Sequence, residues 1–211
     1  MSESPSVNKD RVLTCSVYCN GNKLGNEYTL VAATVHLELN RIGKATLKFN
    51  AGNMNKQTFD ESDADLFKPG NAIRLEVGDI EKENILFDGM IIGLRIITDK
   101  DFHSYMLVEC RDHAYSATQG RKNRIFEKKK DCDIIKEVLS AYGSVEVDST
   151  PYQYPTLVQY YCSDWDFALS RADANGLFIF TDGGKIKVKK PDVSTSPVLT
   201  VTYGVDLTTF D

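Results

Sequence analysis

The 211-residue chain lacks long apolar runs and an excess of basic residues, and its first residues, MSESPSVNKDR, do not have the basic-then-apolar pattern expected of a secretory leader. Its longest apolar stretch, residues 90–97, is interrupted by Gly93 and Arg95, whereas a membrane-spanning helix needs about 20 apolar residues. Lysine and arginine total 25 against 30 aspartates and glutamates, and the net charge of −5 argues against a nucleic-acid-binding domain. We expect the protein to be made in the cytoplasm and to leave it only by a route without a signal peptide.

Cysteine and histidine are scarce, and neither forms a metal-binding or catalytic motif. The five cysteines are Cys15, Cys19, Cys110, Cys132 and Cys162, and the three histidines are His36, His103 and His113. An odd number of cysteines without a leader argues against a disulfide framework. Cys15 and Cys19 lie about 13 Å apart on a predicted strand, so they cannot share one zinc ion. No nucleophile motif accompanies Cys110 and His113. We therefore predict no metal, no cofactor and no enzymatic activity.

Alternating apolar and polar residues run through the first half of the chain and predict β-strands. A strand places successive side chains on opposite faces, so a period of two indicates a half-buried sheet. The predicted strands cover residues 11–19, 28–40, 44–50, 72–77, 84–97 and 102–111. Gly89 and Gly93 are expected to be bends or bulges in the longest of them. Short strands separated by turn signals favour a barrel or a sandwich.

An acidic stretch separates the third and fourth predicted strands. Residues 51–68 include Asp60, Glu61, Asp63 and Asp65, and clustered carboxylates can bind calcium. Their spacing does not match that of an EF-hand loop, so a solvated acidic loop is the favoured interpretation.

Two helical patterns appear in the second half. The first has Asp131 as its predicted N-cap, and its apolar residues at positions 134, 135, 138, 139 and 142 share one face before Gly143 ends it. The second covers residues 164–175, with Ser163 as N-cap and Asp166 in a capping-box-like position.

The rest of the second half is predicted to be β-structure and linker. Residues 177–189 form a hairpin, residues 191–197 a linker and residues 198–203 a final strand. Asp164 and Asp166 point about 200° apart on a helix, so they are assigned to helix capping rather than to paired acid–base catalysis. A small α/β unit inserted between parts of a β-barrel explains this order of elements.

One strongly basic segment precedes the first helix. It contains Arg121, Lys122, Arg124, Lys128, Lys129 and Lys130. Its simplest interpretation is a solvated loop, partly balanced by Glu127 and Asp131. Because the whole chain is acidic, we favour a protein-partner surface over nucleic-acid binding as its function.

Four segments, in order, resemble motifs of VgrG spike proteins and of the hub proteins of contractile phage tails. The most specific runs from Gln159 to Phe178 and is similar to "vQy-x-E-S-D-w-d-F-l-x-R-x-x-E-x-x-G-l". Cys162 and the pair Asp173-Ala174 depart from it where acidic residues are expected. The matched residues are Phe87, Gly89, Phe126, Ile134, Ile135, Leu139, Gln159, Tyr160, Ser163, Asp164, Trp165, Phe167, Leu169, Arg171, Gly176, Gly204, Leu207 and Phe210.

The resemblance implies a mixed β and α+β fold, in which a tube-like antiparallel β-barrel carries an inserted small α/β domain. Residues 1–118 would form the barrel, 119–190 the inserted domain and 191–211 a return strand. The second barrel and the needle of such proteins would lie outside this chain. Trp165, Phe167 and Leu169 are then expected to be core or domain-packing residues.

The resemblance also implies a structural role in a contractile injection machine of the type VI secretion kind. Three full-length copies would form a ring that caps a tube of hexameric, Hcp-like rings and carries the puncturing tip. Baseplate proteins and secreted effectors would be further partners, and the machine itself would export the protein. The alternatives are a phage-tail-like baseplate hub and, from other classes, a hydrolase or an effector adaptor acting through the basic segment.

Overall fold

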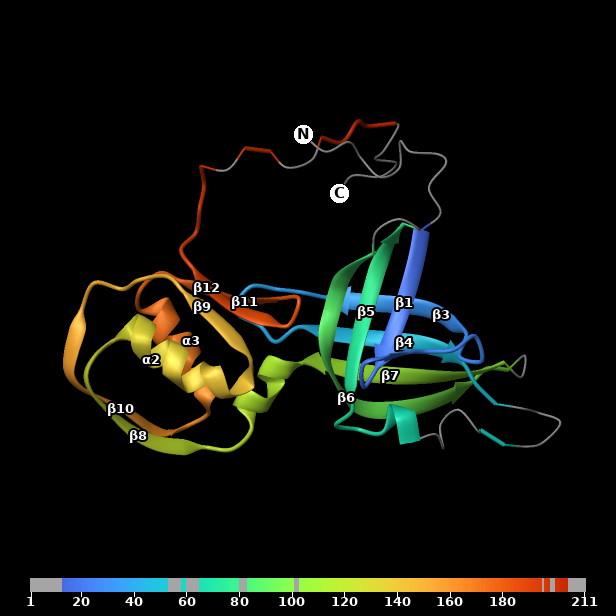
Figure 1. Ribbon diagram of the computed structural model, residues 1–211, viewed down its shortest axis with the longest axis horizontal. Helices are drawn as coiled ribbons and strands as arrows, with labels where there is room; N and C mark the ends of the chain where they lie inside the picture. Colours follow the sequence, from blue (N-terminus) through green and yellow to red (C-terminus); the bar gives the residue numbers. More distant parts are fainter. Residues whose placement is uncertain are drawn as a thin grey trace.

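The computed structural model describes residues 13–52, 58–59, 65–79, 83–100, 103–194, 196–197 and 200–204. Its first lobe is a seven-stranded sheet in which every pair of neighbours is antiparallel (Figure 1). The strands are β1 Leu13–Cys19, β2 Asn22–Lys23, β3 Leu30–His36, β4 Lys44–Asn50, β5 Ala72–Asp79, β6 Glu83–Thr98 and β7 Ser104–Asp112. Their order across the sheet is β2-β1-β5-β6-β7-β4-β3.

A single apolar core fills the concave side of this sheet. The inward residues of β4 and β7, such as Leu47, Phe49 and Met106, are buried in one cluster with residues of β1, β5 and β6. Strands from both ends of the sheet share this cluster because the sheet curves strongly. The alternation predicted from the sequence is confirmed in β4 and in most of β7, where every second residue is buried. It is not seen in β3, which is exposed along most of its length and ends at His36, so the prediction of an alternating strand over residues 28–40 is wrong in its second part.

The predicted closed barrel is not what the described residues form. Within them the sheet is open, with β2 at one edge and β3 at the other. A two-residue strand extends only about 7 Å, so β2 offers too little backbone to pair with the seven-residue β3. The correction is from a closed barrel to a curved, open antiparallel sheet.

The two glycines of β6 have the local roles expected of bends. The pairing of β6 with β7 shifts register between Ile91 and Gly93, which marks a bulge there. At Gly89 a side chain would collide with the neighbouring strand, because a Cβ atom would lie 2.1 Å from the carbonyl oxygen of Arg111. Glycine thus allows β6 and β7 to approach closely where the sheet bends.

The second lobe encloses two helices between a β-ribbon and a three-stranded sheet (Figure 1). Its elements are η3 His113–Thr118, β8 Lys122–Lys130, α2 Asp131–Leu139, η4 Ser140–Tyr142, β9 Ser144–Val147, β10 Gln153–Cys162, α3 Asp164–Asp173, β11 Phe178–Asp182 and β12 Lys185–Lys189. β8 and β10 pair as an antiparallel ribbon. β12 pairs antiparallel with β11 and parallel with β9.

Both predicted helices exist, with corrected ends. Lys130 is the N-cap of α2, and Asp131 is the first helical residue instead of the cap. Ser163 does cap α3, because its Oγ accepts a hydrogen bond from the Asp166 backbone N–H at 3.1 Å. That helix ends at Asp173, two residues earlier than predicted, and Gly176 then takes a positive φ of 63°. A positive φ at this point reverses the chain after the helix.

Some predicted elements differ from the structure, and others fall on residues that the structure does not describe. Residues 200–203 form no strand, contrary to the prediction for 198–203, and residues 198–199 are not described. Most of the acidic stretch is also outside the description, although Asp65 is seen to pair with Lys68 at 2.6 Å. The predicted hairpin is confirmed as β11 and β12.

The two lobes meet at the connection between β3 and β4. Asn40 donates its backbone N–H to the Ile179 carbonyl at 2.7 Å, and its Oδ1 accepts the Ile179 N–H at 2.9 Å. On the other side of the junction, buried Asp112 accepts the Ala114 N–H at 2.8 Å and caps η3. Burial raises the pKa of the Asp112 carboxyl, against the lowering effect of this bond.

Candidate assembly surface

The β8–β10 ribbon has one face in the core and one in solvent. On its inner face, Phe126 and Gln159 are buried. On its outer face, Ile125 and Val158 are register partners and are 68% and 50% exposed, and Tyr160 is 80% exposed. Single exposed apolar residues are ordinary, but a cross-strand pair extended by a tyrosine is a candidate contact surface. We call Ile125, Val158 and Tyr160 the ribbon row.

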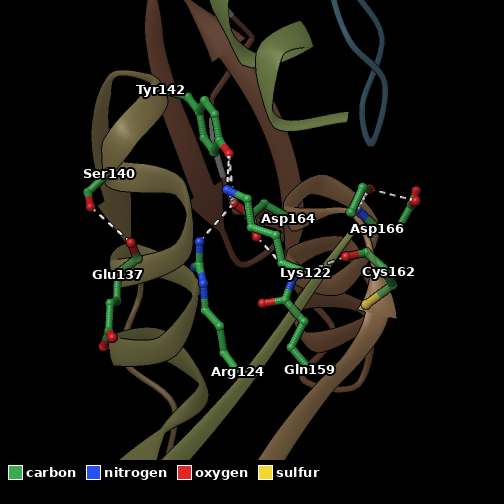
Figure 2. Close-up of polar contacts among 10 residues, drawn as sticks. Lys122, Arg124, Glu137, Ser140, Tyr142, Gln159, Cys162, Asp164 and Asp166 are labelled. Carbon is green, nitrogen blue, oxygen red and sulfur yellow. Dashed lines mark hydrogen bonds and ion pairs between the residues drawn. The ribbon is translucent and has the colours of Figure 1, made fainter. Parts of the chain in front are cut away.

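A buried carboxylate fixes this ribbon to the helices (Figure 2). Asp164, the first residue of α3, has a fully buried side chain. From β8, Lys122 Nζ donates to its Oδ2 at 2.6 Å and Arg124 Nη2 donates at 3.2 Å. From β10, Gln159 Nε2 donates to its Oδ1 at 2.9 Å. The Tyr142 hydroxyl also donates to Oδ2, at 2.7 Å, so residues from η4 and both ribbon strands converge on Asp164.

The electrostatics of the Asp164 cluster favour its charged form. Burial by itself raises the pKa of Asp164, but hydrogen bonds from Gln159, Lys122 and Tyr142 outweigh burial and hold that pKa below its usual range. The same hydrogen bond to Asp164 raises the pKa of the Lys122 ammonium. The cluster is thus a charge-compensated brace between the ribbon and α3.

A second charged cluster ties the other end of the ribbon to both helices. Arg171 of α3 grips the buried carboxylate of Asp131 with two hydrogen bonds, Nε at 2.6 Å and Nη2 at 2.9 Å. Asn175 Nδ2 donates to the same carboxylate at 2.8 Å, and Arg171 also donates to the Tyr154 hydroxyl of β10 at 2.7 Å. Burial works against ionisation of Asp131, but the Arg171 and Asn175 contacts hold its pKa below the usual range.

The sequence-based interpretation of the two carboxylates of α3 was incomplete. Asp166 does take part in the cap, since Ser163 Oγ donates to its Oδ2 at 2.6 Å. The Asp164 carboxylate instead accepts hydrogen bonds from the four side chains described above. The interpretation missed this role because the partners come from residues 122–159 and no short-range spacing reveals them.

The predicted basic surface is divided by the fold. Lys122 and Arg124 face Asp164, and Lys129 pairs with Glu137 of α2. Arg121 lies over the ring of Tyr161, 4.8 Å from its centroid. Lys128 and Lys130 are exposed, with Lys128 at a positive φ of 51°. A partner surface made of all six cations is therefore reduced to Arg121, Lys128, Lys130 and the partly engaged Lys129.

The remaining residues matched to the VgrG-like motif lie in different parts of the structure. Phe87 is in the core of the first lobe. Phe126, Ile134, Ile135, Leu139, Trp165 and Phe167 are in the core of the second, with Leu169 packed against it. Gly204 takes a positive φ of 84°. Leu207 and Phe210 lie outside the described residues.

The residues considered for catalysis or metal binding do not assemble into a site in the described part of the chain. Cys110 is buried, and burial raises the pKa of its thiol to about 12, so it is not a thiolate nucleophile near neutral pH. His113 instead faces Asp88, 3.4 Å away, and this contact raises the His113 pKa. Among the described residues, no group of three or more histidine, cysteine or acidic side chains is placed to hold a metal ion.

Sequence reasoning missed the ribbon itself. β8 reads KNRIFEKKK, where adjacent Ile125 and Phe126 conceal the alternation and the charges suggest a loop. β10 includes Pro155, which discourages a strand assignment. The available signal was the richness of residues 152–162 in tyrosine, threonine and valine, which favour strands.

Comparison with known protein families shows to which family the chain belongs. A family model described as the Alg8 N-terminal domain matches residues 9–211. The chain belongs to this family. No curated protein matches the chain in sequence.

Solved structures of phage tail and type VI secretion proteins share the fold of this Alg8 N-terminal domain. The 43 kDa tail protein of prophage MuSo2 from Shewanella oneidensis is 13% identical with a TM-score of 0.66, over 84% of this chain and 53% of that one. A tail protein from Neisseria meningitidis is 14% identical with a TM-score of 0.65, over 88% of this chain and 53% of that one.

A third match is an E. coli component of the type VI secretion system, described as structurally similar to the T4 tail proteins gp27 and gp5. It is 14% identical with a TM-score of 0.59, over 82% of this chain and 48% of that one. The present chain thus spans about half the length of these structures. At such low identity the likeness is one of fold.

Across the described residues, no helix combines the length and apolar character needed to cross a membrane.

Proposed function

We propose that this chain is part of the hub of a contractile injection machine, of the kind found in type VI secretion. In this proposal three full-length copies form a ring that caps a tube of hexameric rings and carries the puncturing tip. Residues 1–118 supply a tube-like domain, 119–190 the inserted domain, and 191–211 the return toward the tube. The protein acts as a structural part and not as an enzyme, and leaves the cell with the machine.

The observation that carries the proposal is the ribbon row, an apolar surface that the described part of the chain leaves exposed. Ile125 and Val158 alternate along their strands with the buried Phe126 and Gln159, and Gln159 donates a hydrogen bond to Asp164. A pre-ordered surface loses little side-chain entropy on binding, which suits a part that assembles with fixed geometry. The fold shared with tail and secretion components supports the same role.

A phage-tail-like baseplate hub is the second candidate, favoured by the fold shared with the two tail proteins. The two candidates differ in the part attached to the hub, since a secretion spike carries a needle. Images of the full-length gene product distinguish them, because a needle is a long, thin density on one side of the ring.

The test is to locate the chain in purified injection particles. We expect an affinity label on the full-length product to lie at one end of the tube in electron micrographs. An I125D/V158D variant should fold but fail to enter the particles, because two buried charges at an interface prevent association. V193D, which changes an exposed residue outside the ribbon, is the matched control and should be incorporated normally. Label along the sheath, or normal incorporation of I125D/V158D, would contradict the proposal.

A further inference from the structure

Three basic residues form a row across the outer face of the first lobe. His36, Lys44 and Arg111 are register partners on the adjacent strands β3, β4 and β7. Directly opposed side chains on a sheet lie about 5 Å apart at Cβ, and like charges there are destabilising. The pair Lys44 and Arg111 therefore requires a compensating anion or remains a cost to the fold.

No carboxylate of the described chain compensates this pair. Arg111 donates to a backbone carbonyl, that of Cys110, at 3.1 Å, and Lys44 has no ion-pair partner among the described residues. Two acidic side chains nearby in the sequence pair with other cations, and one of them, Glu38, lines the cavity described next together with its partner Arg41. Glu109 binds Arg95 at 2.7 Å, and Glu38 binds Arg41 at 3.2 Å. The positive charge thus stays available although the protein as a whole is acidic.

A cavity lies over this row, at the junction with the second lobe. Its volume is about 330 Å³. The lining contains the cations Arg41, Lys44 and Arg111, one carboxylate, Glu38, and also His36, Asn40, Ile42 and Trp165. The Trp165 indole N–H has no hydrogen-bond partner among the described residues, so it adds a donor beside an apolar ring. The connection between β3 and β4 contributes Ile42 as the other apolar residue of the lining.

We propose that this cavity, the Lys44–Arg111 pocket, binds a peptide segment of a protein partner in which acidic and apolar residues are neighbours. The guanidinium and the ammonium would hold carboxylates, since Arg111 can offer two parallel N–H donors and Lys44 a point charge. Trp165 and Ile42 would take the apolar side chains. Two cations in an acidic protein suit a short anionic segment better than a long polyanion such as nucleic acid. The proposal is independent of the hub role.

Trp165 provides a direct readout, because it is the only tryptophan in the chain. The probe is a short synthetic peptide of alternating glutamate and leucine, without aromatic residues. We expect a saturable change in tryptophan fluorescence that weakens as salt is added. The matched peptide with glutamine in place of glutamate should give little change. No change with the acidic peptide, or an equal change with both, would overturn the proposal.

Two double variants locate the binding. Lys44→Gln with Arg111→Gln should weaken peptide affinity by about tenfold or more, the loss expected from one to two charge-assisted hydrogen bonds. Lys128→Gln with Lys130→Gln removes as much charge from the β8 surface and should leave affinity unchanged. The reverse pattern would assign the peptide to the basic segment and overturn the pocket.

Two controls keep the result interpretable. If the pocket double variant does not fold, Lys44→Glu alone changes only an exposed residue, and unchanged binding by it counts against the proposal. Tighter binding of a single-stranded oligonucleotide than of the acidic peptide, with the same fluorescence change, would also count against it.

Discussion

The two lobes are stabilised in different ways. In the seven-stranded lobe, the core is a continuous apolar cluster, and its buried polar side chains are confined to Ser16 and Asp112 among the described residues. In the second lobe, six buried polar residues, including Asp131 and Asp164, lie beside the apolar core. Both of these carboxylates join elements far apart in the sequence. Curvature and apolar burial therefore shape the first lobe, whereas charged clusters fix the position of the ribbon in the second.

The largest expected effect is on the apolar core of the second lobe. Trp165→Ala should lower the free energy of unfolding by about 3–5 kcal/mol, the range for removing a large core aromatic side chain. Urea unfolding measures this loss, and Trp165→Phe should lose clearly less. An unchanged melting temperature in Trp165→Ala would remove Trp165 from the core.

The next effect comes from the Asp131 cluster. Arg171→Ala should cost about 3 kcal/mol, because it leaves a buried carboxylate without its guanidinium. Adding Asp131→Asn should recover part of that loss, since the uncompensated charge is then gone. If Asp131→Asn lowers the free energy of unfolding by the same amount with and without Arg171→Ala, the two residues are not coupled. The cluster would then not have the stabilising role assigned to it.

Asp164→Asn should cost less, about 2 kcal/mol, because its partners Lys122 and Arg124 are partly exposed and can be hydrated when the carboxylate is lost. The ribbon should also loosen, which hydrogen exchange of β8 and β10 amides detects. Exchange that accelerates equally in the first lobe would contradict a local bracing role.

The pH dependence should separate the lobes further. Asp131 and Asp164 have folded pKa values below the unfolded value of about 3.9, so their stabilisation is complete above that value and is lost as the pH falls through the folded pKa. Asp112 has a raised pKa, and its contribution has the opposite sign, growing as the pH falls. Melting temperatures from neutral to acidic pH should therefore drop less steeply in Asp131→Asn/Asp164→Asn and more steeply in Asp112→Asn. If melting temperature falls with pH in the same way in the unsubstituted protein, in Asp131→Asn/Asp164→Asn and in Asp112→Asn, this assignment is refuted.

The smallest effect should come from an exposed ion pair at the same ribbon. Glu137→Gln removes the partner of Lys129 and should change stability by about 0.5 kcal/mol or less, as for other surface pairs. A loss as large as that of Asp164→Asn would mean that the difference between buried and exposed charges is not what fixes the ribbon.

The same contrast explains how far the sequence could predict the structure. Alternation located most strands of the first lobe, because strands such as β4 and β7 bury every second residue. It made β3 too long and gave no sign of β2, because these two strands are mostly exposed. It could not show that the sheet stays open, since closure depends on which edges meet. In the second lobe, the caps and apolar faces revealed α2 and α3, but β8 and β10 were hidden by charges and a proline. The pairing of Arg171 with Asp131 was out of reach because these residues are 40 positions apart.

The native mass of the full-length gene product, measured by light scattering and accompanied by electron-microscopy class averages, tests the central claim most directly. The hub proposal predicts a trimer that appears as a six-lobed ring. A compact monomer without a ring would contradict it, and would mean that the Alg8 N-terminal domain fold is present here without the assembly.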